Sequence, residues 1–267
     1  MDLLTERLLL RPIRHSDAKT VERAIFEDPE VVKGLAHDGS DPEVREFHSR
    51  NWSGFGPDGD RAMWRECGIG LYVISDRSET LAPPSQFLGI AGVYLEEQHG
   101  KWGGELFYAL ASEFHGQRVM SEACAAVVER FRSIADAGSL YAVYWRLLNP
   151  ASGKILDRLG FEPDGSQSLL DEYDAEIAAG IRRFELWRLA NASASQQARI
   201  AGEAAIKLGH IESEGISSAD ENLVAILDAI ADDERARALQ PAVASALQRG
   251  RETPGLAMMR YHAPGST

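Results

Sequence analysis

The segment that decides the fold runs from ELFYAL (Glu105–Leu110) through ASEFHGQRVMSEACAAVVERF to LYAVYWRL (Leu140–Leu147). Its two ends are rich in aromatic and branched apolar residues, a composition typical of strands. Between them, apolar residues recur at the spacing of one helix face, namely at Val119, Ala123, Val127, Phe131 and Ile134. This order predicts a strand, helix, strand unit with parallel strands and a right-handed crossover.

Shorter signals predict the elements around this unit. Strands are expected at Arg7–Pro12, Gly70–Ser75, Phe87–Leu95 and Arg183–Arg188, the second and third being antiparallel neighbours. Helices are expected at Asp17–Phe26, at Asp41–Trp52 and from Pro150, with Asn149 as its cap and Gly160 at its end. The pattern predicts a layered α/β fold in which a central mixed, twisted sheet is flanked by helices.

Beyond about Ala190 the composition turns Ala-rich and Ser-rich, so we place a domain boundary there, between residues 1–190 and a helical extension over 191–267. Ser218 and Glu221 form a capping box ahead of one apolar helix face, made by Leu223, Ile226, Leu227 and Ile230. The domain over residues 1–190, the tail itself or a second subunit must cover that face, so a homodimer is one alternative. Pro241 is expected to start a last helix that stops at Gly250, with a loosely held terminus after it.

Composition and charge narrow the function. The formal net charge of -13 argues against binding to nucleic acid and suits a cationic substrate, although it also serves solubility. No run is apolar enough to cross a membrane and the N-terminus lacks the form of a signal peptide, so we expect a cytoplasmic protein that binds no membrane. Cys67, Cys124 and the seven histidines show no metal-ligand spacing, so no metal is expected.

A glycine-containing turn, SEFHGQRVMSEA, leads directly into the helix of the central unit. Backbone N–H groups at a helix N-terminus have no intrahelical partner and favour an anion. Gly116 would let the backbone approach such a ligand closely. From this feature alone, an ordinary turn and an anion site both stay open.

Two further segments carry a resemblance to a known family. TERLLLRPIRHSD (Thr5–Asp17) is similar to a TERLxLRPxxxxD opening, and NPASGKILDRLGF (Asn149–Phe161) is similar to a segment of the form NxxSxxxLxxxGF. Both are typical of the GNAT superfamily, in the branch that includes ribosomal-protein alanine N-acetyltransferases. The resemblance covers most of residues 1–190 and implies the GNAT fold, with acetyl-CoA as co-substrate.

The resemblance also implies which residues meet the coenzyme. The two parallel strands would splay apart, so that Tyr108 and Leu110 face the pantetheine arm, with Asn149 beside it or acting only as a helix cap. The pyrophosphate would lie on the loop and first helical turn formed by His115, Gly116, Gln117, Arg118, Val119 and Met120. Glu113 and Arg118 depart from the family's loop pattern. Glu113 is unfavourable unless it points away, and Arg118 either adds bulk or turns outward to pair with a phosphate.

For catalysis, the resemblance implies Glu105 as the base that takes a proton from the amine, and Ser152 as the group that contacts or protonates the coenzyme sulfur. Tyr108 and Tyr144 are the substitutes for Ser152. The structural alternatives are an ordinary strand-end glutamate and a first-turn serine that bonds locally. Trp52, Phe55 and Trp64 either line the acceptor side or pack in the core.

The function expected is transfer of an acetyl group to a primary amine, on a peptide or protein N-terminus or a small molecule, by direct attack in a ternary complex. The acidic insert with Asp171, Glu172, Asp174 and Glu176 either attracts that amine or is a solvated loop. Two alternatives stay open. One is a GNAT fold retained as a binding or protein-interaction module, and the other is a longer acyl donor.

Overall fold

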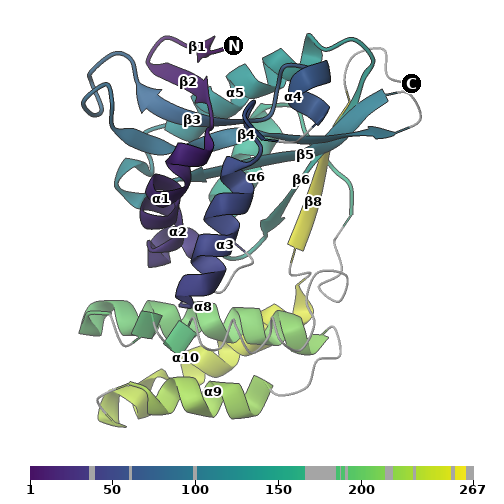
Figure 1. The fold of residues 1–267 in the computed structure, drawn as a ribbon. Coiled ribbons are helices and arrows are strands. Elements are labelled where there is room, and N and C mark those ends of the chain that lie inside the picture. Colours follow the sequence, from purple (N-terminus) through teal and green to yellow (C-terminus); the bar gives the residue numbers. More distant parts are fainter. Residues whose placement is uncertain are drawn as a thin grey trace.

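The computed structural model describes residues 1–35, 40–59, 62–98, 101–165, 185–186, 188–189, 192–213, 219–230, 233–253 and 256–262. These residues form a twisted sheet with helices on both faces and a further helical layer beneath it (Figure 1). No helix in these ranges is both long and apolar enough to span a membrane. The acidic insert around Asp171 lies outside the described residues.

The sheet has, in the described residues, eight strands in the order β1-β2-β3-β4-β5-β6-β8-β7. Their bounds are β1 Leu3–Leu4, β2 Leu8–Pro12, β3 Leu71–Asp76, β4 Phe87–Gln98, β5 Lys101–Leu110, β6 Ala137–Trp145, β7 Glu162–Pro163 and β8 Leu256–His262. All neighbouring pairs are antiparallel except β5 and β6, which are parallel. The predicted mixed sheet, with its parallel central unit, is therefore confirmed.

The helices fall into two groups along the chain. The first comprises α1 Ala18–Val21, which continues as a π-helical turn to Phe26, then α2 Pro29–Val32, α3 Pro42–Ser53, α4 Ala62–Glu66, α5 Val119–Arg132 and α6 Pro150–Arg158. The second comprises α8 Ala194–Ser213, α9 Ala219–Asp228 and α10 Asp233–Glu252. Asn149 caps α6 and Gly160 follows its end with a φ of +82°, as the sequence predicts.

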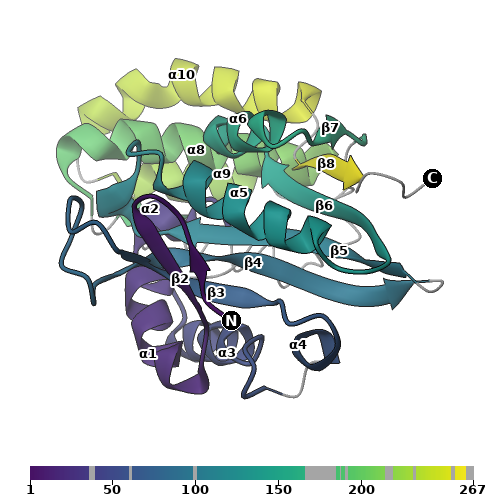
Figure 2. The same cartoon turned by 90° about the horizontal axis from the view of Figure 1, so that it is seen from above.

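The sheet separates two hydrophobic cores. Figure 2 shows α5 and α6 over one face and α1 and α3 over the other. Alternation along β5 supplies both cores, because successive side chains of a strand point to opposite faces. Leu106, Tyr108 and Leu110 contact the cluster under α5, whereas Phe107 and Ala109 belong to the cluster under α1 and α3.

The second helical group has a core of its own, to which the predicted apolar face contributes Ile226 of α9 and Ile230 just beyond its end. Helices α8 and α10 cross closely through two glycines. A Cβ on Gly209 would lie 2.3 Å from the Leu247 carbonyl oxygen, and one on Gly250 would lie 2.3 Å from that of Ile206. The crossing therefore depends on residues that have no side chain.

Ion pairs join α8 to α2. Arg199 contacts Glu30 at 2.6 Å, and Lys33 contacts Glu203 at 3.4 Å. Glu203 also pairs with Arg188 at 2.6 Å. These ion pairs link α8 to the segment around α2. Each exposed pair contributes little to stability individually.

The end of the chain departs from the sequence prediction in three ways. Residues 183, 184 and 187 of the strand predicted at Arg183–Arg188 lie outside the described residues, and for the rest the prediction is wrong: residues 185–186 and 188–189 are helical, and Glu185 pairs with Arg188 one helical turn later. The loosely held terminus is also wrong for β8, which pairs antiparallel with β6 along Ser139–Trp145. Pro241 does not start a helix but lies inside α10.

The last strand of the sheet thus follows the helices rather than preceding them. Leu256, Ala257 and Met259 are buried there, which gives the strand an apolar face to place against the sheet. The separate extension over 191–267 stays a prediction.

Candidate active site

Strands β5 and β6 pair over only part of their length. The paired residues are Trp102 with Ala137, Gly104 with Leu140 and Glu105 with Tyr141. From Leu106 to Leu110, β5 pairs with β4 alone, and the far half of β6 pairs with β8. Backbone groups on the open edge of β5 are therefore available to a ligand that enters between the strands.

The loop after β5 has a backbone suited to holding an anion. Gly116 has a φ of +78°, and no atom lies within 4 Å of where its Cβ would be. Arg118 also lies in the left-handed region, with a φ of +61°, and its side chain makes no cap for α5. The first N–H groups of α5 thus face an open, exposed loop, where the positive end of the helix dipole favours negative charge.

The side chains of the loop leave its centre accessible. His115 Nε2 donates to the Leu110 carbonyl at 3.0 Å, and Gln117 Nε2 donates to that of Glu113 at 3.1 Å. The Glu113 carboxylate accepts from Gln86 at 3.3 Å and so turns toward the start of β4. The exposed Arg118 guanidinium makes no hydrogen bond or ion pair with any described residue, and it is free to meet an anion.

Tyr108 and Ser152 meet across the gap between β5 and α6. Their hydroxyl oxygens are 2.5 Å apart, and Ser152 is only 5% exposed. Burial raises the pKa of Tyr108, although the bond to Ser152 opposes the shift, so the phenol stays protonated at neutral pH. Asn149 Oδ1 accepts from the Ser152 N–H at 3.3 Å, which fixes the first turn of α6.

Glu105 lies on the other face of the sheet from this pair. It shares the alternation of Phe107 and Ala109, and Phe107 packs against Trp52 of α3 with ring centroids 4.3 Å apart. Glu105 is the last β5 residue that pairs with β6, so its backbone marks the point where the strands separate. Because Tyr108, the partner of Ser152, and Glu105 project from opposite faces of β5, the two predicted catalytic side chains are not brought together on one face.

Several predicted residues contribute through the backbone or through packing. Val119 and Met120 are buried under the sheet, so only their N–H groups can face the loop. Trp52 and Trp64 are also buried, and the Trp64 indole N–H donates to the Phe55 carbonyl at 2.5 Å. Trp64 therefore packs in the core under α5, and Trp52 packs against Phe26 and Phe107 in the core under α1 and α3.

A family model for the acetyltransferase (GNAT) domain matches residues 7–162, which is more than half of the chain. The chain belongs to the GNAT acetyltransferase family. The resemblance on which the fold prediction rests is thereby confirmed. GNAT acetyltransferases use an acyl-CoA as donor, and β5, the loop after it, α5 and α6 all lie within the matched residues.

Solved GNAT structures similar to this chain include a ribosomal-protein-S5-alanine acetyltransferase from Vibrio fischeri, with 19% identity, 63% of this chain and 86% of that chain covered, and a TM-score of 0.47. A ribosomal L7/L12 α-N-protein acetyltransferase in complex with coenzyme A has 16% identity, coverage of 63% and 88%, and a TM-score of 0.48. An Agrobacterium tumefaciens acetyltransferase has 21% identity, coverage of 61% and 85%, and a TM-score of 0.47. No curated protein sequence matched significantly.

The N-terminal residues of the GNAT signature have contacts that sequence reasoning missed. Arg11 forms a bidentate ion pair with Asp17, with both bonds at 2.7 Å. This ion pair stabilises the start of the first helical segment. Thr5 and Arg7 bind Glu122 in the first turn of α5. The Thr5–Asp17 signature identifies the family, but nothing in its local pattern indicates that Thr5 and Arg7 bind a residue more than 100 positions later.

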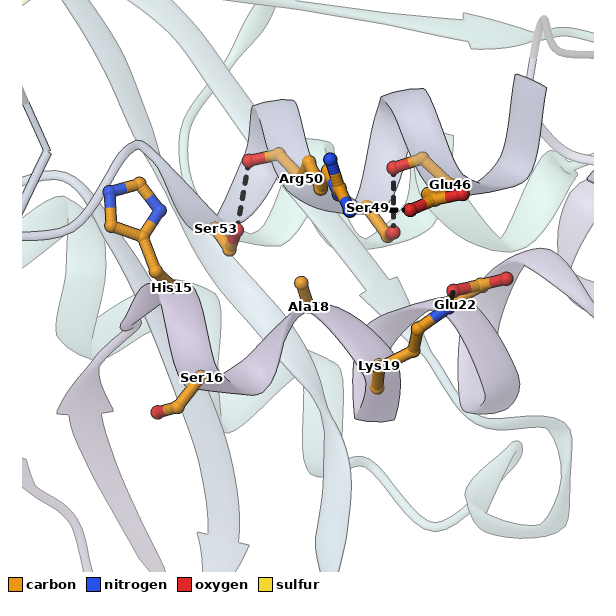
Figure 3. Close-up of a pocket in the computed structure, with 9 residues that line it drawn as sticks. All are labelled: His15, Ser16, Ala18, Lys19, Glu22, Glu46, Ser49, Arg50 and Ser53. Carbon is orange, nitrogen blue, oxygen red and sulfur yellow. Dashed lines mark hydrogen bonds and ion pairs between the residues drawn. The ribbon is translucent and has the colours of Figure 1, made fainter. Parts of the chain in front are cut away.

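A hollow of about 560 Å³ lies between α1 and α3 (Figure 3). Its charges are paired within each helical segment, Lys19 with Glu22 and Arg50 with Glu46. The hydroxyls of Ser49 and Ser53 donate to carbonyls of their own helix. None of its lining residues comes from β5, α5 or α6, so this hollow is separate from the loop site.

Proposed function

We propose that this chain transfers an acetyl group from acetyl-CoA to a primary amine, by direct attack of the amine in a ternary complex. The observation that carries the proposal is the open turn at Gly116 and Arg118, which lies beside the unpaired edge of β5. Family membership makes an acyl-CoA the donor class, and this turn offers N–H groups and a guanidinium that suit its pyrophosphate.

The residues of the turn fit the coenzyme despite their departure from the family pattern. Glu113 is directed to Gln86, so its carboxylate does not occupy the anion position. Arg118 has the bulk that the pattern excludes, but its side chain is exposed and adds a positive charge. His115, Gly116, Gln117, Val119 and Met120 would then contribute mainly through backbone groups, and Tyr108, Leu110 and Asn149 would border the arm.

Acetyl-CoA supplies the acetyl group as a thioester when it is bound. Glu105 is proposed as the base that accepts the amine proton, directly or through water, because its strand position marks the opening between β5 and β6. Ser152 is proposed to donate its hydroxyl proton toward the departing sulfur. Tyr108, protonated and 2.5 Å from Ser152, would hold that hydroxyl in place.

The acceptor is proposed as a primary amine, on a peptide or protein N-terminus or on a small molecule. The net charge of -13 suits a cationic acceptor. Two of the three similar structures named above are described as ribosomal-protein acetyltransferases, so a peptide N-terminus is the first class to test.

A thiol-release assay with acetyl-CoA and a panel of amines tests this function. The panel includes N-terminal peptides of ribosomal proteins, a polyamine and an aminoglycoside. We expect turnover with at least one amine, and losses of about 100-fold in kcat for Glu105→Gln and Ser152→Ala. Saturable coenzyme binding without turnover on any amine would instead support the binding-module alternative.

A further inference from the structure

The turn between β1 and β2 is hydrogen-bonded to the first turn of α5. Thr5 Oγ1 donates to Glu122 Oε1 at 2.5 Å, the Arg7 backbone N–H donates to the same oxygen at 3.0 Å, and Arg7 Nε donates to Oε2 at 2.8 Å. Both carboxylate oxygens of Glu122 are therefore engaged by a turn more than 100 residues earlier in the chain.

The same guanidinium also reaches the loop before α5. Arg7 Nη1 and Nη2 each lie 3.3 Å from the carbonyl oxygen of Gln117. Arg7 thus contacts residues on both sides of Arg118, the loop residue with a left-handed backbone. A planar guanidinium that bonds two acceptors in fixed directions restricts the backbone between them more than a single ammonium would.

The ion pair between Arg7 and Glu122 also neutralises a negative charge in the first turn of α5. Burial on its own would raise the pKa of Glu122, but the hydrogen bonds from Thr5 and Arg7 outweigh it and hold the pKa below its usual range. Glu122 is therefore ionised at neutral pH. An unpaired carboxylate in this first turn would repel an anion bound at the same helix end, and Arg7 neutralises it.

We infer that Arg7 is a positioning residue for the pyrophosphate group of the coenzyme: it fixes the Gln117 carbonyl and neutralises Glu122, so that the N–H groups of α5 remain directed at an anion. The inference rests on the proposed function. Arg7 itself need not touch the ligand.

Calorimetric titration of the full chain with coenzyme A tests the inference, using wild type, Arg7→Met and Arg11→Met. Arg11 is the matched control, because this nearby arginine of β2 forms an ion pair with Asp17 and lies outside the loop site. We expect Arg7→Met to bind about tenfold more weakly, and Arg11→Met to bind like wild type. Equal affinity of Arg7→Met and wild type would overturn the inference.

Two more variants separate positioning from a general loss of structure. Arg7→Met/Glu122→Gln removes the unpaired carboxylate, so about a threefold recovery of affinity over Arg7→Met is expected. Arg7→Lys keeps the charge without the two-sided contact, so an affinity between those of wild type and Arg7→Met is expected. Wild-type affinity in Arg7→Lys, or no recovery in the double variant, would contradict the corresponding part of the inference. Absence of binding by wild type would refute the proposed function instead.

Discussion

The Tyr108 hydroxyl lies 2.5 Å from the Ser152 hydroxyl and joins β5 to α6 across the open edge of the sheet. Burial raises the pKa of Tyr108, so the phenol keeps its proton at neutral pH, and either hydroxyl can donate this bond. When Tyr108 donates, the Ser152 hydroxyl accepts this bond and keeps its own proton for another acceptor. This arrangement is consistent with the proposed role of Ser152 at the coenzyme sulfur.

Loss of either hydroxyl should lower kcat more than it raises KM for acetyl-CoA. We expect about a tenfold fall in kcat for Tyr108→Phe and about 100-fold for Ser152→Ala, because Tyr108 only orients the donor. Steady-state thiol release measures both constants. Tyr261→Phe is the control, since Tyr261 lies on β8 and packs against Phe161. Unchanged kcat in Ser152→Ala would exclude Ser152 as the acid.

Gly116→Ala should affect both stability and coenzyme binding. A φ of +78° strains any side-chain-bearing residue, so a loss of about 1 kcal/mol in the free energy of unfolding is expected. Gly160→Ala is a matched control, with a φ of +82° and equally open surroundings at the end of α6. Urea unfolding should show similar losses in both variants, but only Gly116→Ala should weaken coenzyme A binding. Equal binding in the two would contradict the loop site.

Gly209→Ala should destabilise the chain because its Cβ would lie 2.3 Å from the Leu247 carbonyl oxygen, and α8 and α10 would have to separate. The expected loss is about 1–3 kcal/mol. Gly202, in the same helix, has no atom within 4 Å of its Cβ position, so Gly202→Ala should be about 0.5–1 kcal/mol more stable than wild type. Thermal unfolding compares the three proteins. A stable Gly209→Ala would mean that the helices are not closely crossed.

The ion pairs on Glu30 should make stability depend on acid pH. Burial alone would raise the pKa of Glu30, but Arg199 and Lys33 hold it at about 2, below its ordinary value of 4.5. The unfolded chain therefore binds this proton more readily, and stability contributed above pH 4.5 is lost as pH falls toward about 2. Because the pair is partly exposed, we expect about 1 kcal/mol.

Urea unfolding at pH 6 and pH 3 measures this dependence. Glu30→Gln has no carboxyl to titrate there, so its stability should fall less between the two pH values. Asp76, whose carboxylate accepts hydrogen bonds from Ser78, Leu81 and Ala82, has a pKa lowered to about 2 and contributes equally to both proteins. An identical pH dependence in Glu30→Gln would show that Glu30 makes no contribution.

The central unit could be predicted from sequence because its signals are local. The helical spacing of Val119 to Phe131 lies between two apolar strand segments, and Asn149 and Gly160 bound α6 by their own backbone preferences. Each of these signals agrees with the packing in the folded chain.

The C-terminal errors arose where tertiary packing overrides local preference. Pro241 favours a helix start, yet α10 continues through it because Leu239 and Val243, on either side, both pack in the same core. The sequence predicts a strand at Arg183–Arg188, yet Glu185 and Arg188 pair at helical spacing, and their side chains form ion pairs with Lys207 and Glu203 of α8. Such partners are distant in sequence.

In the candidate site, too, features with a local signal could be predicted and features that depend on distant residues could not. Gly116 follows from turn chemistry and from the family resemblance, and the structure adds that its backbone is left-handed, with a φ of +78°. Arg7 contacts Gln117 and Glu122, which lie 110 and 115 residues later in the sequence, so no local pattern could indicate these contacts. The direction of the Glu113 side chain depends on Gln86, a neighbour supplied by the fold.

Calorimetric titration with acetyl-CoA, of wild type and of Arg118→Ala at two temperatures, tests the central claim most directly. We predict saturable binding of one coenzyme per chain by wild type, and about tenfold weaker binding by Arg118→Ala, which loses a charge-assisted bond to phosphate. Absence of binding heat for wild type at both temperatures would contradict the account.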